Sequence, residues 1–215
     1  MLLIKLREEV CRVNKALLSA GLVTMHSGNA SGRDKESGLV VIKPSGIDYE
    51  SLCPDDLVVV DLHGSIIEGK LKPSVDTPHH LFLYSQKPDF GGIIHTHSNY
   101  ATSFAALGQG IPVYLTAIAD EFGEEIPCTP YTTNEGDAIG NAILNVMNQS
   151  PAVLLKNHGV FTFGYSPAAA LKAAVMVEDV AKTVHLALLK GKPDVLPLDE
   201  VKKWWTRYHT TYGQK

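Results

Sequence analysis

The chain has 215 residues, 45% of them apolar and 20% charged, which is typical of one globular domain, here residues 1–215, with a sizeable core. Its formal charge is −4 and its sequence has no cluster of basic residues, which argues against nucleic acid as a partner. The three cysteines form no CxxC pair and no apolar run reaches the length of a membrane span, which predicts a soluble cytoplasmic protein without a membrane partner.

The N-terminal half is predicted to begin with a helix and to continue through strands. Apolar residues at helical spacing predict a helix over residues 6–21. The β-branched runs at 38–46 and 56–69 predict strands, the second of them bent into a hairpin. Residues 77–86 begin with a Thr-Pro pair that is typical of a helix start, and they precede a strand predicted at 91–97.

The C-terminal half continues this alternation. Residues 98–108 and 133–147 are predicted helices, and residues 113–119 are a predicted strand between them. Residues 152–164 predict a hairpin, and residues 166–191 predict a long helix that opens with a capping serine and a proline. This mixed order favours a layered α/β or α+β domain over a strictly parallel fold.

Two histidines stand one residue apart at the end of the strand predicted at 91–97. Because successive side chains of a strand alternate between its faces, His95 and His97 share one face. Such a pair is consistent with a metal-binding edge, with two buried hydrogen-bonded groups, or with no special role. His158 also follows an apolar strand and stands beside a glycine, which makes it a third candidate. Three imidazoles with one position left open are typical of a catalytic zinc site.

Asp76 is an available carboxylate in the segment KPSVDTPHH. It is a candidate fourth metal ligand or a base near the metal, and it is equally well placed to cap the helix that follows. The remaining six histidines are expected at the surface or in capping positions: His26, His63, His79, His80, His185 and His209.

Three short loops rich in glycine, serine and proline form a second constellation: HSGNASG, KPSG and KPS. Glycine and asparagine tolerate left-handed backbone and expose N–H groups, serine hydroxyls donate, and Lys43 adds a positive charge. Together these loops suit a phosphate group, although Pro-Ser-Gly is also ordinary turn chemistry. Because neither GxxxxGKS/T nor GxGxxG occurs, a nucleotide cofactor is not indicated.

Six segments, in this order, resemble the class II aldolase and adducin head-domain family: SGNAS, VIKPSGIDY, EGKLKPSVDTPHH, GGIIHTHS, IPVYLTAIADEF and LLKNHGVFTFG. Within the family the chain is most similar to the L-ribulose-5-phosphate 4-epimerases, with the L-fuculose-1-phosphate aldolases next. The resemblance implies a three-layer α/β/α sandwich with a mostly antiparallel central sheet. It also implies a cyclic homotetramer with a divalent metal, usually zinc, in a cleft between neighbouring subunits. Three histidines and a carboxylate would also accept cobalt, manganese or iron.

Carried over position by position, the resemblance assigns roles to individual residues. The implied metal ligands are His95, His97, His158 and Asp76. Asp120 falls on an acid/base aspartate, and Tyr212 falls on a tyrosine that the tail of a neighbouring subunit delivers to the site. The implied substrate- and phosphate-binding positions are Asn29, Lys43, Ser45, Gly46, Ser74 and Thr116.

The reaction implied by the resemblance is the epimerisation of a sugar phosphate, L-ribulose 5-phosphate, to D-xylulose 5-phosphate through retro-aldol and aldol steps. The aldolases of the family carry glutamate at the position of Asp76, whereas the epimerases carry aspartate. A sugar-phosphate aldolase remains the alternative, because Val75 replaces a phosphate-contacting serine, Ile118 replaces a histidine, and the chain is short between Tyr131 and Pro151. The retained histidines argue against a non-enzymatic, adducin-like head.

Overall fold

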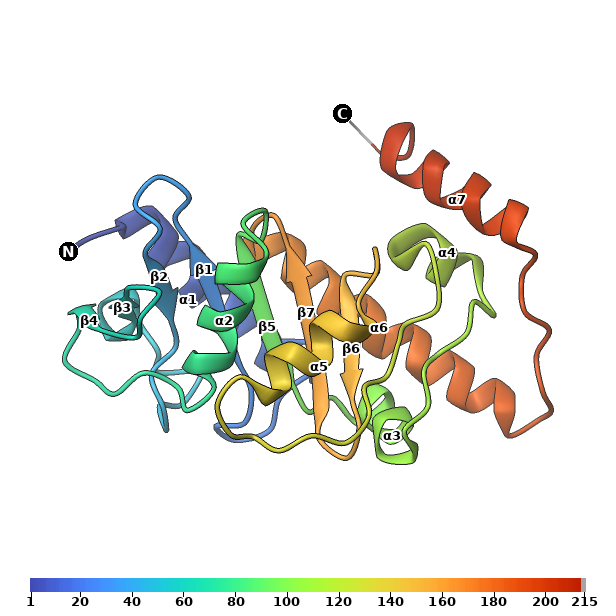
Figure 1. Ribbon diagram of the computed structural model, residues 1–215, viewed down its shortest axis with the longest axis horizontal. Helices are drawn as coiled ribbons and strands as arrows, with labels where there is room; N and C mark the ends of the chain where they lie inside the picture. The colour runs from blue at the N-terminus through green and yellow to red at the C-terminus, as the bar shows by residue number, and fades with distance from the viewer. Residues whose placement is uncertain (214–215) are drawn as a thin grey trace.

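A seven-stranded sheet runs through the centre of the computed structural model, which describes residues 1–213 (Figure 1). The strand order is β4-β3-β2-β1-β5-β7-β6, and every neighbouring pair is antiparallel. The strands are β1 (Asn29–Arg33), β2 (Val40–Ile42), β3 (Val58–Val60), β4 (Ile66–Glu68), β5 (Gly92–Thr96), β6 (Ala152–Leu155) and β7 (Gly159–Gly164).

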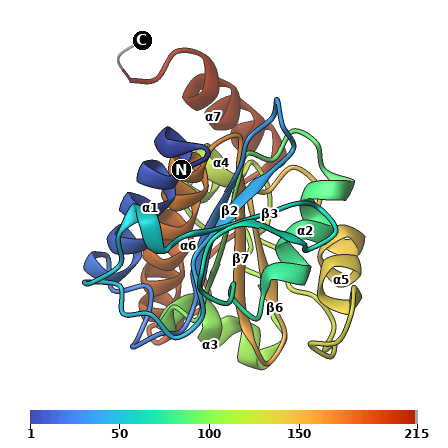
Figure 2. The same cartoon turned by 90° about the vertical axis from the view of Figure 1, so that its left-hand side faces the viewer.

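Helices cover both faces of this sheet and so produce three layers (Figure 2). The helices of one face are α2 (Thr77–Gln86) and α5 (Ala138–Val146), and those of the other are α1 (Ile4–Ser19), α3 (Asn99–Leu107) and α6 (Pro167–Leu188). At one end of the molecule α4 (Thr116–Phe122) packs against α7 (Leu198–Thr210), and a short 3-10 helix, η1 (Pro54–Asp56), precedes β3. The expected α/β/α sandwich with an antiparallel sheet is confirmed.

Strand β5 shows how alternating side chains divide the core into two. Ile93 is buried on the face covered by α2 and α5, whereas Ile94 is buried against α1 and α6 on the other face. Because the side-chain period of a strand is two, His95 returns to the face of Ile93. There its ring stacks on Phe161 of β7 with 4.6 Å between the ring centroids. The packing of the core thus fixes the direction in which His95 points.

Several elements differ from those predicted. The strand predicted at 113–119 is wrong, because residues from Thr116 onward form α4, which ends at Gly123 in the left-handed conformation (φ 68°). In a short segment whose apolar residues are mostly buried, the spacing of those residues does not distinguish a helix from a strand. Strand β1 lies where only a loop was predicted, and α7 lies in a tail for which no element was predicted. The predicted hairpin at 152–164 is confirmed.

None of the helices within residues 1–213 is long and apolar enough to cross a membrane.

Candidate metal and phosphate site

Three histidines meet where β5 ends beside the start of β7. His95 lies near the end of β5, His97 lies just beyond it, and His158 occupies the bend between β6 and β7. One ring nitrogen of each lies within 4.8 Å of the others, and the Nε2 atoms of His95 and His97 are 3.0 Å apart. The structure therefore brings together the three histidines that were predicted as a metal site.

The chemistry of these rings fits a divalent metal ion. His95 Nδ1 is 3.0 Å from the Val160 carbonyl oxygen, which can only accept, so Nδ1 carries the proton and Nε2 keeps its lone pair. Burial lowers the pKa of His95 to about 3 and also lowers the pKa values of His97 and His158, so all three rings are neutral near pH 7. Neutral imidazole is the form that binds metals.

Gly159 makes room for the convergent rings. A Cβ atom at this position would lie 2.6 Å from His97 Cδ2 and 2.5 Å from the Thr96 carbonyl oxygen. Any side chain there would push His97 away from His95. The packing of the rings therefore requires a glycine beside His158.

Asp76 stands at the edge of the same site and is oriented by Asn29. Asn29 Nδ2 donates to Asp76 Oδ2 at 2.6 Å and to Ser74 Oγ at 3.1 Å. The Asp76 side chain makes no hydrogen bond to the start of α2, so the capping alternative is wrong. Although burial acts to raise it, the pKa of Asp76 is held below its ordinary value by the charges that His95 and His80 carry when protonated in acid, and by the hydrogen bond from Asn29. The carboxylate is therefore ionised near the three rings.

The proposed metal ligands and phosphate loops line one cavity of about 270 Å³. The residues predicted from the sequence that line this cavity are His95, His97, His158, Asp76, Asn29, Lys43, Ser45, Gly46 and Ser74. Lys43 is 1% exposed, and no carboxylate within residues 1–213 lies within 4.0 Å of its Nζ atom. Burial lowers the pKa of this ammonium, since it favours the neutral form unless an anion is close. A phosphate in the cavity would supply that anion.

Three other predicted site residues lie elsewhere in the chain. Thr116 begins α4, Asp120 lies in α4, and Tyr212 follows α7; none of them lines this cavity. Burial raises the pKa of Asp120, against the opposing charges of Arg207 and His209, which both belong to α7. Tyr212 is 56% exposed. The role of these residues stays a prediction, and it requires that a second subunit bring them to the cavity.

Other residues of the site were not found from the sequence. His26 lines the cavity as the first residue of the HSGNASG loop, although it was expected at the surface or in a capping position. Asn134 also lines it, from a loop that precedes α5 and not from the helix predicted at 133–147. His79 and His80 were expected at the surface, but they are 4% and 0% exposed, so that expectation is wrong. His80 Nδ1 is 2.7 Å from Ser31 Oγ, because the buried face of α2 points at β1. The four-residue spacing between His80 and the equally buried Tyr84 was the signal for this helix face.

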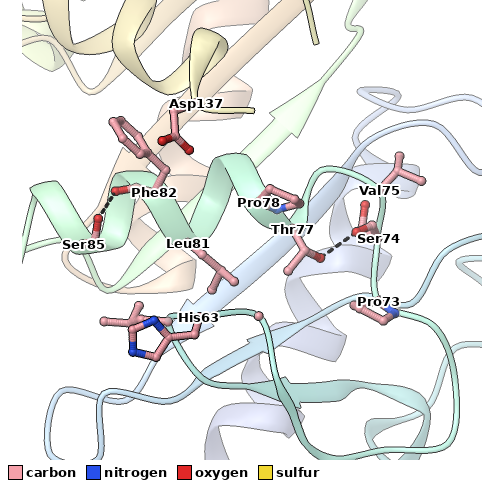
Figure 3. Close-up of a pocket in the computed structure, with 12 residues that line it drawn as sticks. His63, Pro73, Ser74, Val75, Thr77, Pro78, Leu81, Phe82, Ser85 and Asp137 are labelled. Atoms are coloured by element: carbon pink, nitrogen blue, oxygen red, sulfur yellow. Dashed lines mark hydrogen bonds between the residues drawn. The ribbon is translucent and has the colours of Figure 1, made fainter. Parts of the chain in front are cut away.

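A second cavity of about 520 Å³ adjoins the first between α2 and the turn that joins β3 to β4 (Figure 3). Ser74 and Val75 line both cavities, and the Thr77 hydroxyl holds the Ser74 carbonyl at 2.6 Å. The second cavity is larger but is lined mainly by apolar side chains such as Leu81 and Phe82. The groups that could bind a metal ion and a phosphate therefore lie in the smaller cavity, and Val75 lines both cavities.

The family model for the class II aldolase and adducin N-terminal domain matches residues 8–185, and the chain belongs to this family. It is 40% identical over 228 residues to the L-ribulose-5-phosphate 4-epimerase UlaF of Salmonella typhi, covering 98% of this chain and 99% of that protein. A solved L-fuculose 1-phosphate aldolase is similar with a TM-score of 0.87 and 32% identity, covering 95% of this chain and 96% of that one. The L-fuculose-1-phosphate aldolase from Thermus thermophilus is similar with a TM-score of 0.73 and 25% identity, covering 89% of this chain and 99% of that one.

These similarities extend over nearly the whole chain, and the proteins they name are enzymes. Together with the family membership, they identify the chain as an enzyme of the class II aldolase family.

Proposed function

We propose that this protein is a zinc-dependent L-ribulose-5-phosphate 4-epimerase, which forms D-xylulose 5-phosphate. The observation that carries the proposal is the single cavity in which three neutral histidines and an ionised Asp76 face the buried cation Lys43. A ketose phosphate needs both kinds of group, one at its carbonyl end and one at its phosphate. The 40% identity to a protein named for this reaction supports the choice of substrate.

His95, His97 and His158 would hold the metal, with Asp76 as the fourth ligand or as a nearby base. When bound, a divalent ion would supply Lewis-acid polarisation of the ketose carbonyl. Zinc suits three imidazoles best, and cobalt, manganese or iron would also fit this donor set. Asn29 would keep Asp76 pointed at the site in either role.

The phosphate would be held by Lys43 and by the hydroxyl and N–H donors of Ser45, Gly46 and Ser74, with Asn29 beside them. A base removes the proton of the C4 hydroxyl, the C3–C4 bond breaks, and its electron pair moves toward the ketose carbonyl. The two-carbon aldehyde keeps the phosphate and rotates, and C3 of the three-carbon fragment then attacks its opposite face to re-form the C3–C4 bond. The re-formed alkoxide then takes up a proton, which balances the reaction and inverts C4.

Inversion at one carbon needs proton donors or acceptors on both faces of the aldehyde, and Asp120 and Tyr212 would fill these roles. Both would come from a neighbouring subunit of a homotetramer, since neither lines the cavity of its own chain. The packing of α4 against α7 supports joint delivery of the two residues, with Thr116 as a polar group at the start of α4.

A class II sugar-phosphate aldolase similar to the L-fuculose-1-phosphate aldolases is the second candidate. The TM-score of 0.87 with such an aldolase favours it, as does the exposed Val75 at the phosphate end of the cavity. In an aldolase the aldehyde would leave the site, whereas in an epimerase the phosphate loops would retain it.

The deciding experiment is a nuclear magnetic resonance time course of the zinc-loaded protein with L-ribulose 5-phosphate. Formation of D-xylulose 5-phosphate without free fragments is the expected result. Free cleavage fragments, or no reaction together with cleavage of L-fuculose 1-phosphate, would replace the epimerase by the aldolase.

A further inference from the structure

Tyr49 is a buried side chain outside the groups assigned above. It is 2% exposed, and its ring belongs to the core cluster of Val13, Leu17 and Ile94 beneath the end of β1. This packing fixes the ring on one side and leaves its hydroxyl and its other face for polar contacts.

The hydroxyl of Tyr49 ties down the first phosphate loop. Its Oη atom donates toward two backbone carbonyl oxygens, of Ser27 at 2.8 Å and of Gly28 at 2.7 Å. Burial, followed by the charge of Asp76, raises the pKa of Tyr49, so the hydroxyl remains a donor. The loop it holds leads directly into Asn29, which donates to Asp76 and Ser74.

The ring of Tyr49 supports the second phosphate loop through Lys43. Lys43 Nζ lies 4.6 Å from the ring centroid, within the range of a cation–π contact. Its hydrogen bond to the Pro44 carbonyl oxygen is long, at 3.3 Å. The aromatic face therefore steadies the ammonium while leaving N–H donors for an anion in the cavity.

We propose that Tyr49 is a positioning residue for the substrate phosphate, joining the Ser27–Gly28 loop to the Lys43 ammonium through one rigid side chain. The inference rests on the proposed function, because it takes the anion in the cavity to be the phosphate of the substrate. It assigns Tyr49 no contact with the substrate itself. Its contribution is to hold two separate loops at the spacing that one phosphate requires.

Two substitutions separate the two contacts. Tyr49→Phe keeps the ring beneath Lys43 but removes the hydroxyl, whereas Tyr49→Leu removes both. Calorimetric titration with inorganic phosphate should show the dissociation constant rising about threefold in Tyr49→Phe and about tenfold in Tyr49→Leu. Tyr165→Phe is the matched control, because Tyr165 is 79% exposed and lies outside this cavity.

Kinetics and a double variant distinguish positioning from a general loss of structure. With L-ribulose 5-phosphate, KM should rise in the order wild type, Tyr49→Phe, Tyr49→Leu, while kcat and bound metal change by less than about twofold. In a Lys43→Met background, Tyr49→Leu should raise the dissociation constant for phosphate by a much smaller factor than it does in the wild type, because the ammonium that Tyr49 supports is absent.

Three results would overturn the inference: unchanged phosphate affinity in Tyr49→Leu, full additivity with Lys43→Met, or no phosphate binding by the wild type. The titration needs no turnover. A protein that binds phosphate in this Tyr49-dependent way but does not epimerise would overturn only the proposed reaction.

Discussion

The cavity around His95 and the α4–α7 end of the molecule differ in how firmly one chain holds their groups. His95 is 1% exposed and fixed by the Val160 carbonyl, whereas Tyr212 is 56% exposed and stacks on Tyr208 of the preceding helix. The cavity is assembled largely by strand pairing, whereas the α4–α7 end exposes Thr116 and Tyr212 and leaves Asp120 half-buried. Substitutions in the cavity should therefore alter metal or phosphate binding, and substitutions at the α4–α7 end should alter proton transfer alone.

The largest effect is expected for His97→Asn. Losing one of three convergent imidazoles should remove most of the bound metal and lower activity by at least about a hundredfold. Mass spectrometry of bound metal and a coupled assay would measure both. His63→Asn, on an exposed turn, is the matched control and should change neither. A His97→Asn protein that keeps its metal would contradict the assignment of the site.

Asp120→Asn should separate the two regions. If Asp120 transfers a proton, epimerisation should fall by about a hundredfold or more, with metal content and phosphate affinity at wild-type levels. The amide keeps the size of the side chain and removes only its ability to exchange a proton. Unchanged turnover would show that the role assigned to this aspartate is wrong.

Mixed oligomers test whether the two regions meet across a subunit boundary. Equal amounts of His97→Asn and Asp120→Asn chains, each inactive alone, should recover up to about a quarter of wild-type activity after refolding together. A site is intact only when an Asp120→Asn chain supplies its cavity and a His97→Asn chain supplies its aspartate, and each of these conditions is met about half of the time. The separately refolded variants are the controls. No recovery in oligomers shown to be mixed would place both residues in the site of one chain.

Strand pattern predicted most of the sheet and the shared face of His95 and His97, because a period of two is visible within a few residues. The sequence also indicated His158 as a third candidate ligand, but only because it follows a separate apolar strand. His26 was missed although it begins the HSGNASG loop, because a loop motif does not show which of its side chains reach the cavity. Asn134 was missed because it was placed in a helix that begins only at Ala138. Burial of His79 was missed because a polar side chain on a helix does not reveal which face is covered.

The smallest effect is expected where α6 secures the helical end. Lys172 of α6 pairs with Glu121 of α4 at 2.7 Å and lies 4.6 Å from the ring centroid of Tyr208 in α7. The Glu121 side chain is 7% exposed, so removing its partner leaves a largely buried carboxylate. Lys172→Met should cost about 1 kcal/mol of stability, a modest amount because Lys172 itself is half-exposed.

Hydrogen exchange measures directly whether Lys172→Met loosens α7. Exchange in α7 should quicken while β5 keeps its protection. If Asp120 and Tyr212 act together, kcat should fall a few-fold with metal content unchanged, because the packing of α4 against α7 that carries them would loosen. Lys190→Met, at an exposed position after α6, is the control for loss of one surface charge. If α7 kept its protection, the contact between Lys172, Glu121 and Tyr208 would not be what holds this helix, and the packing of Trp205 against Gly123 would carry that role instead.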